Sequence, residues 1–517
     1  MADMAGLGSW VAALLFVGVV VPGAVGCGPG ESSSTDGTGG GGGDGGGGGP
    51  VCPEDPAEGP VPEECGIWVS ASLGNDGNAG TQAEPVASLM RAIELANDGP
   101  ERVYACGETW SETLVVPFGV SLYGGFDCEA NWAYLGEPKR MMVTSPGPIA
   151  ITWVADEPEG KPSMLVDFYV EASDAVEPGA SSIGVFVRDV RPLTILRGEV
   201  VAGNGADGAD GEPGDVNPPT KSGTPGTDGA DACSAAVSAG GSSMELNCPG
   251  SAPNPYGGKG GDAGSATAED GQAGGQASDV PGGEGGLGQQ SAPTCTSGAP
   301  GAPGMAGSAG YGGDADGRLE ETGYVGDRGV NGSFGIPGQG GGGGGAMLGS
   351  ALVCGAANPG GAAGGSGGTG GCGGWGGRGG QGGGGSLPLA LRGDVDLQYI
   401  LLRSRRGGNG GNGGPPQLGA SGGAGGKGGN GTGSIPPGCA GGAGGTGGKG
   451  GWGGGGAGGP SLGVVYALGV GAPPLWEVDW DLSMIEGGTG GIGDPTDPDS
   501  DGALGPAGQL NGLEGTF

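Results

Sequence analysis

Short apolar runs recur at close intervals between residues 51 and 201, and their spacing predicts a β-rich domain. The runs are IWVSA, RVYAC, TLVVP, VSLYGGF, RMMVTS, AITWV, SMLVDFYVEAS and IGVFV. Turn residues separate them at distances too short for intervening helices. Regular short strands of this kind fit a sandwich, a barrel or a solenoid, so the pattern indicates an all-β class and leaves the architecture open.

One segment of this region has the period of a helix. Leu89, Ile93 and Ala96 fall on one helical face, with Ala92 and Leu95 beside it. We therefore expect an amphipathic helix near residues 85–97.

Beyond residue 201, long glycine-rich tracts alternate with apolar islands at about 346–354, 386–403 and 461–486. The longer islands each read as two strands around a turn, followed by R-G-G-N-G or E-G-G-T-G. We expect these islands, within 202–486, to be further strands of the same domain, with the tracts as insertions that leave from a similar corner. Separate hairpins joined by disordered segments are the alternative. Residues 487–517 are expected to form an acidic tail rich in Gly and Pro.

Glycine accounts for 142 of the 517 residues and proline for 41. Because glycine has no side chain to bury, backbone hydrogen bonds, cross-links or a neighbouring scaffold must order the tracts. The stretches GADGADGEPGDV, from Gly205, and GAPGAPGMAGSAG, from Gly298, place glycine at every third residue. That spacing suits extended left-handed chains that pack at their glycine faces, and disorder is the alternative.

Residues 1–26 have the pattern of a secretory signal peptide, with an apolar run, Trp10–Val21, that is short for a transmembrane helix. The following A-V-G-C resembles the lipobox of bacterial lipoproteins. The resemblance implies lipidation of Cys27 and a membrane partner through that anchor; ordinary cleavage and free secretion are the alternative. Residues 27–50 predict a flexible Gly/Ser tether. Gly28 resembles the sorting context of outer-membrane lipoproteins, so we expect the outer membrane or cell surface.

The cysteine count agrees with export. The chain has 11 cysteines and no C-x-x-C motif. Lipidation of Cys27 would leave an even number for pairing, and disulfides are the expected state in an oxidising compartment.

The segment 67–132 resembles a known family. The order of IWVSASLGNDGNAGT, Pro85, a helix and VYACGETWSETLVVPFGVSLYGGFDC is similar to the entry of pectate-lyase-like right-handed parallel β-helix proteins, in particular a group of unknown function among secreted and surface proteins. The resemblance implies that residues 51–201 are the first coils of a parallel β-helix and that the helix near 85–97 caps the first coil.

In that architecture, Cys106 and Cys128 are 22 residues apart, which is about one coil. Equivalent positions on successive coils lie about 4.8 Å apart, within the range that a disulfide spans. We expect a Cys106–Cys128 disulfide and a second one between Cys52 and Cys65.

The formal net charge of −37 excludes a nucleic-acid-binding role, because phosphate neutralisation needs an excess of Lys and Arg. The chain contains no histidine. This removes Ser-His and Cys-His nucleophile pairs and His-ligated metals, so an enzyme would have to use carboxylates, Lys, Arg or Tyr.

Two motifs have the spacing of known binding loops. GNGGNG, Gly408–Gly413, matches the dinucleotide-binding pattern, but no helix can follow it in so glycine-rich a sequence, so we expect an exit into an insertion. DPDSDG places Asp497, Asp499 and Asp501 at calcium-loop spacing, although Gly508 stands where the bidentate Glu belongs. A weak calcium site and an acidic solvated tail both stay open.

The sequence favours an exported, lipid-anchored surface protein with a structural or adhesive role and no catalytic activity. A carbohydrate-binding or polysaccharide-degrading protein is the alternative, with polysaccharide or other surface components as partners. Isolated Trp375 and Trp452 could stack on sugars or hold their tracts to the scaffold. Arg191, Arg197, Arg403, Arg405 and Arg406 could belong to a catalytic site, and they are explained as well as solvated corners.

Overall fold

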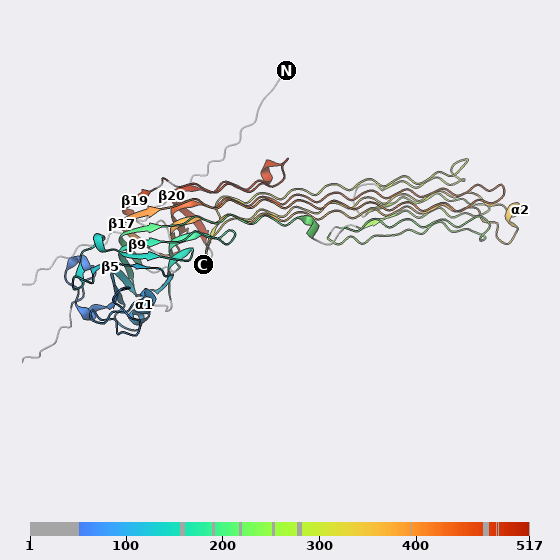
Figure 1. The fold of residues 1–517 in the computed structure, drawn as a ribbon. Coiled ribbons are helices and arrows are strands. Elements are labelled where there is room, and N and C mark those ends of the chain that lie inside the picture. The colour runs from blue at the N-terminus through green and yellow to red at the C-terminus, as the bar shows by residue number, and fades with distance from the viewer. Residues whose placement is uncertain are drawn as a thin grey trace, which may run out of the picture. The chain divides into compact units, whose positions relative to one another are not determined.

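Two largely parallel β-sheets and a bundle of extended glycine-rich runs make up most of the chain (Figure 1). The computed structural model describes residues 51–155, 161–188, 192–216, 220–250, 254–276, 282–393, 395–468, 475–481, 483 and 485–515. Within these ranges, neither helix is long and apolar enough to cross a membrane.

The first sheet has ten strands, and its main path is parallel throughout. That path is β1 (Ile67–Val69), β2 (Arg102–Cys106), β5 (Ser121–Asp127), β9 (Ser163–Glu171), β11 (Leu193–Val201), β17 (Val395–Arg403) and β19 (Leu475–Asp481). The short strands β3 (Thr109–Trp110), β6 (Ala133–Tyr134) and β7 (Met141–Thr144) pair beside it.

The second sheet has eight strands. Its order is β15 (Gly323–Val325), β14 (Arg318–Glu320), β20 (Ala507–Gly515), β18 (Ser461–Ala467), β16 (Ser386–Leu391), β10 (Ser182–Val187), β8 (Ile149–Val154) and β4 (Leu114–Pro117). From β8 to β20 the chain alternates between the two sheets, apart from short strands within the glycine-rich insertions. These include a two-stranded sheet of β12 (Pro255–Tyr256) and β13 (Gly275–Gln276).

The main core lies where the apolar faces of the strands meet. Trp153, Phe168 and Val185 are fully buried there. The helix α1 (Leu89–Asn97) covers strands β1, β2 and β4. It begins at Ser88, whose hydroxyl accepts the N–H of Arg91 at 3.2 Å, as N-caps do. Its predicted face is correct, since Leu89, Ala92, Ile93 and Ala96 are all buried.

Three long strands of the ten-stranded sheet share a left-handed residue at their centres. Asp167 in β9, Arg197 in β11 and Tyr399 in β17 have φ of 51°, 51° and 56°. The strand register places these positions side by side. A non-glycine residue in this conformation costs roughly 1 kcal/mol or more, so the surrounding contacts must hold each bend.

The glycine-rich tracts are ordered runs that lie side by side (Figure 1). Run 408–429 is antiparallel to run 363–384 and donates a backbone hydrogen bond at every third residue. The donors are the N–H groups of Gly408, Gly411, Gly414, Gln417, Ala420, Gly423, Gly426 and Gly429, and the acceptors are the carbonyls of Gly384, Gln381, Arg378, Trp375, Cys372, Thr369, Ser366 and Ala363. A period of three matches the left-handed extended helix of polyproline and collagen chains.

Glycine allows the backbones of neighbouring runs to approach each other closely. A Cβ at Gly379 would lie 1.7 Å from the carbonyl oxygen of Gly329 in the next run. Among the described glycines of run 363–384, none has a positive φ, so their backbone conformation does not itself require glycine. The lack of a Cβ is therefore what lets these backbones hydrogen-bond to one another.

The number of glycines per triplet follows the number of neighbours. Run 363–384, written mostly Gly-Gly-x, is almost entirely buried and bonds to runs on several sides. Run 298–310, written Gly-x-x, exposes many of its other residues. Residues 340–345 are all glycine, and all are buried at the point where further runs join.

Aspartates add a side-chain ladder along one edge of the bundle. Each carboxylate accepts a backbone N–H of the neighbouring run at 2.6 to 2.7 Å. The pairs are Asp207 with Asn409, Asp210 with Asn412, Asp228 with Lys427 and Asp231 with Asn430. Three disulfides also join the tracts: Cys233–Cys354, Cys248–Cys372 and Cys295–Cys439.

The long insertions share one corner of the fold, as expected. They leave after β11, β17 and β19 of the first sheet and return into β16, β18 and β20 of the second. Two expectations differ from the structure. Residues 346–354 hold the short helix α2 (Ala351–Cys354) and no strand, because the backbone of Ala346 and Met347 bonds within the bundle, to Glu269 and Ala362.

The expected tail at 487–517 is also integrated into the fold. Gly488 and Gly491 bond into the bundle, and β20 pairs with β18 because Leu510 and Leu513 bring apolar side chains to the sheet. The remaining elements are single 3-10 turns: η1 (Pro56–Glu58), η2 (Glu63–Cys65), η3 (Glu137–Lys139), η4 (Gly214–Val216) and η5 (Pro498–Ser500).

Candidate functional site

A row of charged side chains crosses the carboxyl ends of β9, β11, β17 and β19. We call it the arginine–carboxylate row; it consists of Glu171, Glu199, Arg403, Arg405 and Asp481. Strand register assembles it, since Glu171, Arg403 and Asp481 occupy equivalent positions on their strands. All five side chains are partly exposed.

Both arginines of the row are paired with its carboxylates, and Arg403 is shared between two of them. Arg403 Nε lies 2.8 Å from Glu199 Oε1, and its Nη1 lies 3.3 Å from Asp481 Oδ2. Arg405 Nη2 lies 3.2 Å from Glu171 Oε1. The row therefore offers both donors and acceptors at nearly balanced charge, on a chain whose net charge is −37.

Two cavities open along the row. The first, of about 270 Å³, is lined by Glu199, Arg403, Arg405 and Asp481 together with Tyr169, Val201 and Ser404. The second, of about 560 Å³, is lined by Glu171 and Arg405 with the prolines 146 and 148 and with Ser145, Ser173 and Val176 among others. Arg405 borders both cavities, which therefore lie next to each other.

Two groups at the row, Tyr169 and Asp481, have pKa values shifted from their usual range. Burial, together with a hydrogen bond to Glu171, raises the pKa of Tyr169 to about 12, so its hydroxyl stays protonated and donates to Glu171 at 3.0 Å. Hydrogen bonds from Ser483, and the charge of Arg403, hold the pKa of Asp481 below its usual value. The geometry thus supports hydrogen bonding to a polar ligand more directly than proton transfer.

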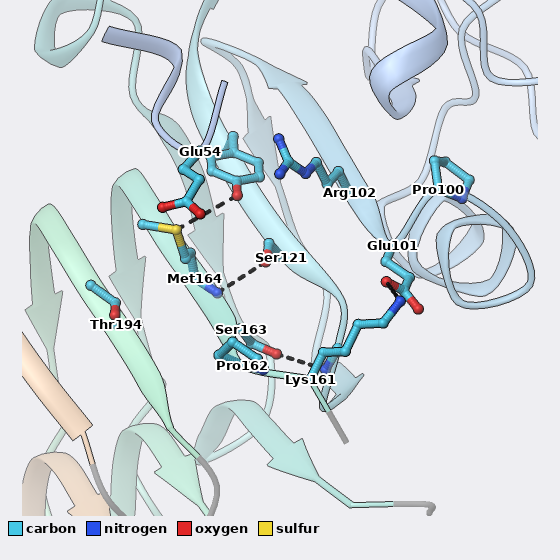
Figure 2. A pocket seen from close by; sticks show the side chains of 12 residues that line it. Glu54, Pro100, Glu101, Arg102, Ser121, Lys161, Pro162, Ser163, Met164 and Thr194 are labelled. Atoms are coloured by element: carbon cyan, nitrogen blue, oxygen red, sulfur yellow. Dashed lines mark hydrogen bonds and ion pairs between the residues drawn. The ribbon is translucent and has the colours of Figure 1, made fainter. Parts of the chain in front are cut away.

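A third cavity, of about 390 Å³, lies at the opposite ends of the strands (Figure 2). Its charged groups are engaged in contacts within the chain: Lys161 pairs with Glu101, and Arg102 donates to the carbonyl of Pro53. Ser121 accepts the N–H of Met164 at 3.1 Å. The contact with Pro53 fastens the segment after Cys52 to the sheet, and the other contacts join the loops and strands that line the cavity, so these groups have a structural role.

The charged cluster around Arg197 also makes its contacts within the fold. Its guanidinium bonds to both oxygens of Asp55 at 2.6 and 2.7 Å and to both oxygens of Asp167 at 3.0 Å. Tyr134 donates to Asp167 at 2.6 Å. Burial lowers the pKa of Arg197, but these bonds outweigh it and the pKa rises. The cluster holds the left-handed bends of Asp167 and Arg197 and uses its charges internally.

The structure contains the two disulfides expected from sequence. Cys52–Cys65 and Cys106–Cys128 have Cα separations of 5.6 and 5.7 Å. Cys27 and the expected signal peptide and tether lie outside the described residues, as does Arg191.

The calcium candidates have structural partners. Asp497 caps η5 by accepting the N–H of Asp499 at 3.2 Å, and Asp501 accepts the N–H of Gly493 at 2.9 Å. Within the part of the chain described, no three His, Cys, Asp or Glu side chains are grouped closely enough to hold a metal ion.

The other sequence motifs belong to the bundle. The N–H groups of Gly408 and Gly411 in the GNGGNG stretch bond to run 363–384. Trp375 packs against Phe334 with ring centroids 4.6 Å apart, which favours a holding role over an exposed sugar platform. Trp452 is half-buried.

The sequence left Arg403 and Arg405 open as members of a catalytic site or as solvated corners, and it did not predict that they assemble with the carboxylates of the row. Aligning the ends of the three islands would have placed Arg403 beside Asp481, but no sequence signal brings in Glu171. No protein-family model matches the chain, and no curated protein or solved structure matches it significantly. Its function must be inferred from its own residues.

Proposed function

We propose that this chain is an exported surface protein with a structural or adhesive role, anchored to the membrane through a lipid on Cys27. The observation that carries the proposal is the bundle. Backbone hydrogen bonds order it, and its outer runs, such as 298–310 and 408–429, expose side chains at regular intervals. Such a scaffold presents a broad, preordered surface for contact, which suits binding more than chemistry.

Export is supported by the cysteines. The ten cysteines between residues 51 and 517 form five disulfides, and Cys27 is the eleventh. Disulfides of this density persist in oxidising compartments. An outer-membrane or cell-surface location follows if Cys27 carries lipid, and a secreted protein follows if it does not.

For the sheets we propose a right-handed parallel β-helix, similar to the pectate-lyase-like group, with α1 as its cap. Support comes from the parallel pairing along both sheets and from the alternation of the chain between them. In such a fold each turn of chain adds one strand to each sheet.

The test has two parts. The wild-type protein should label with a fatty-acid probe in its host, and Cys27→Ala should remain unprocessed or appear in the medium. The purified protein should bind cell-envelope material or isolated envelope polysaccharides without degrading them. A protein that neither labels nor binds any envelope fraction would sink the proposal.

The second candidate is a carbohydrate-active protein, and the arginine–carboxylate row favours it. Close carboxylates beside arginines, next to cavities of about 270 and 560 Å³, are the kind of site in which a polysaccharide could be held or cleaved. Release of reducing or unsaturated sugars by homogeneous protein, lost in Arg403→Ala, would establish that role over the first.

A further inference from the structure

Ser404 lies in the wall of the cavity of about 270 Å³ at the arginine–carboxylate row. The residue is 2% exposed, and its hydroxyl has no hydrogen-bond partner among the described residues. A buried hydroxyl without a partner destabilises a fold, because it has lost its water and gained nothing in return. Because this oxygen is itself buried, the Ser404 side chain must rotate toward the cavity before a bound ligand can supply the missing partner.

A described cavity and a buried side-chain atom without a partner occur together at one site among the described residues. Other buried side-chain atoms without a partner among the described residues include Trp153 Nε1 and Tyr324 Oη, but Ser404 alone among the residues with such atoms lines a described cavity. The neighbouring hydroxyl of Ser386, by contrast, accepts the N–H of Arg405 at 2.7 Å. Ser404 is thus the polar group near the row that the fold itself leaves unused.

The surrounding groups define the chemistry of the ligand. Glu199 and Asp481 offer acceptor oxygens, and Arg403 and Arg405 offer donor nitrogens beyond those used in their ion pairs. Donors and acceptors that alternate in this way suit a ligand with several adjacent hydroxyls, each of which both donates and accepts. A negatively charged ligand would also lie close to the carboxylates of Glu199 and Asp481, at an electrostatic cost.

We propose that the cavity at Ser404 binds an uncharged sugar residue. Ser404 hydrogen-bonds one sugar hydroxyl, while the shared side chains of the row bond the adjacent hydroxyls. The second cavity, which shares Arg405 and carries Pro146, Pro148 and Val176, receives the apolar face of the next sugar in the chain. The ligand is therefore a neutral oligosaccharide of at least two residues.

The inference rests on the proposed binding role and narrows it to one class of ligand. It can fail by itself: a protein that binds envelope material through its bundle but binds no neutral sugar would keep its proposed function and lose this site.

The experiment is calorimetric titration of the intact protein with cellotriose, maltotriose, xylotriose and mannotriose, and with trigalacturonate as an acidic comparison. We expect saturable binding of at least one neutral trisaccharide. Ser404→Ala should weaken that binding roughly fivefold, which is the usual effect of one hydrogen bond. Ser404→Leu, which fills the cavity, should abolish it. Ser297→Ala, on the exposed bundle, is the matched control and should bind like the wild type.

Stability separates a ligand contact from a structural role. Because its hydroxyl makes no bond in the fold, Ser404→Ala should unfold at the same temperature as the wild type or higher. The inference is overturned if no neutral trisaccharide binds, if trigalacturonate alone binds, or if Ser404→Ala and Ser404→Leu bind as tightly as the wild type.

Discussion

The sheets and the glycine bundle are ordered by opposite means. In the sheets, large side chains such as Trp153 and Phe168 are fully buried and the backbone bonds run between strands. In the bundle, residues such as Gly379 bury backbone directly against backbone. Side-chain burial supplies the hydrophobic stabilisation in the first region, whereas the second depends on hydrogen bonds, cross-links and the absence of side chains.

A glycine-rich sequence can therefore specify a fold when its glycines recur with a period of three residues. Glycine occupies the triplet positions at which another run packs. A run with one glycine per triplet therefore has fewer neighbours than a run with two. The same glycines in an unspaced linker would have no such partners.

Adding one methyl group inside the bundle should have the largest effect. Gly379→Ala places its Cβ about where the carbonyl oxygen of Gly329 lies, and the run cannot shift without losing its period-three bonds. We expect a loss above about 5 kcal/mol or a bundle that no longer forms. Limited proteolysis should then cut the glycine tracts while the sheets resist. Ala424→Val, at an exposed position, is the control and should leave the bundle intact.

Removing a large side chain should destabilise the sheets more than the bundle. Phe168→Ala in the sheet core should cost about 3–5 kcal/mol, because it leaves a cavity in a closely packed region. Phe334→Ala, the same change in the bundle at a side chain 38% exposed, should cost about 1 kcal/mol. Chemical denaturation of both variants measures the contrast, and equal losses would contradict it.

The disulfides should matter more to the bundle than to the sheets. The Cys248–Cys372 bond closes a segment with a sequence separation of 124 residues. Replacing both cysteines by serine should cost about 3 kcal/mol, since the unfolded chain regains the freedom that the cross-link removed. Hydrogen exchange, followed separately in the sheets and in the glycine runs during thermal unfolding, should show that the loss of stability lies in the glycine runs. A loss confined to the sheets would break the comparison.

The smallest effect should be a pH-dependent one in the sheet region. Burial raises the pKa of Asp55, but its bonds to Arg197 outweigh burial and lower it. The stability that Asp55 contributes is therefore present above its unfolded value of about 3.9 and lost as pH falls through the folded pKa. Asp55→Asn should cost roughly 2 kcal/mol at pH 7 and little near pH 2. Asp98→Asn, at an exposed carboxylate, should show neither effect, and a pH-independent cost of Asp55→Asn would refute the explanation.

Local patterns predicted the local structure. The run RVYAC became β2, and the helical period around Leu89 became α1, because alternation and capping act over a few residues. The disulfide between Cys106 and Cys128 followed from the family resemblance and one strand spacing.

Long-range register could not be predicted. Arg405 meets Glu171 across a separation of 234 residues, because the first and longest glycine-rich insertion lies between β11 and β16. The unpaired hydroxyl of Ser404 is likewise invisible in sequence, since a lone serine after a strand carries no signal until the strands are placed. The order of the bundle was one of two open readings, because composition alone also fits disorder.

The most direct test of the account is residue-resolved hydrogen exchange in run 438–450. The N–H groups of Gly441, Gly444 and Gly447 bond to run 408–429, and those of Gly442, Gly445 and Gly448 bond to run 330–345. Those of Ala443, Thr446 and Lys449 have no partner among the described residues. We predict two protected amides followed by one fast-exchanging amide, repeated along the run. Uniformly fast exchange, or protection without a period of three, would contradict an ordered bundle held by its backbone.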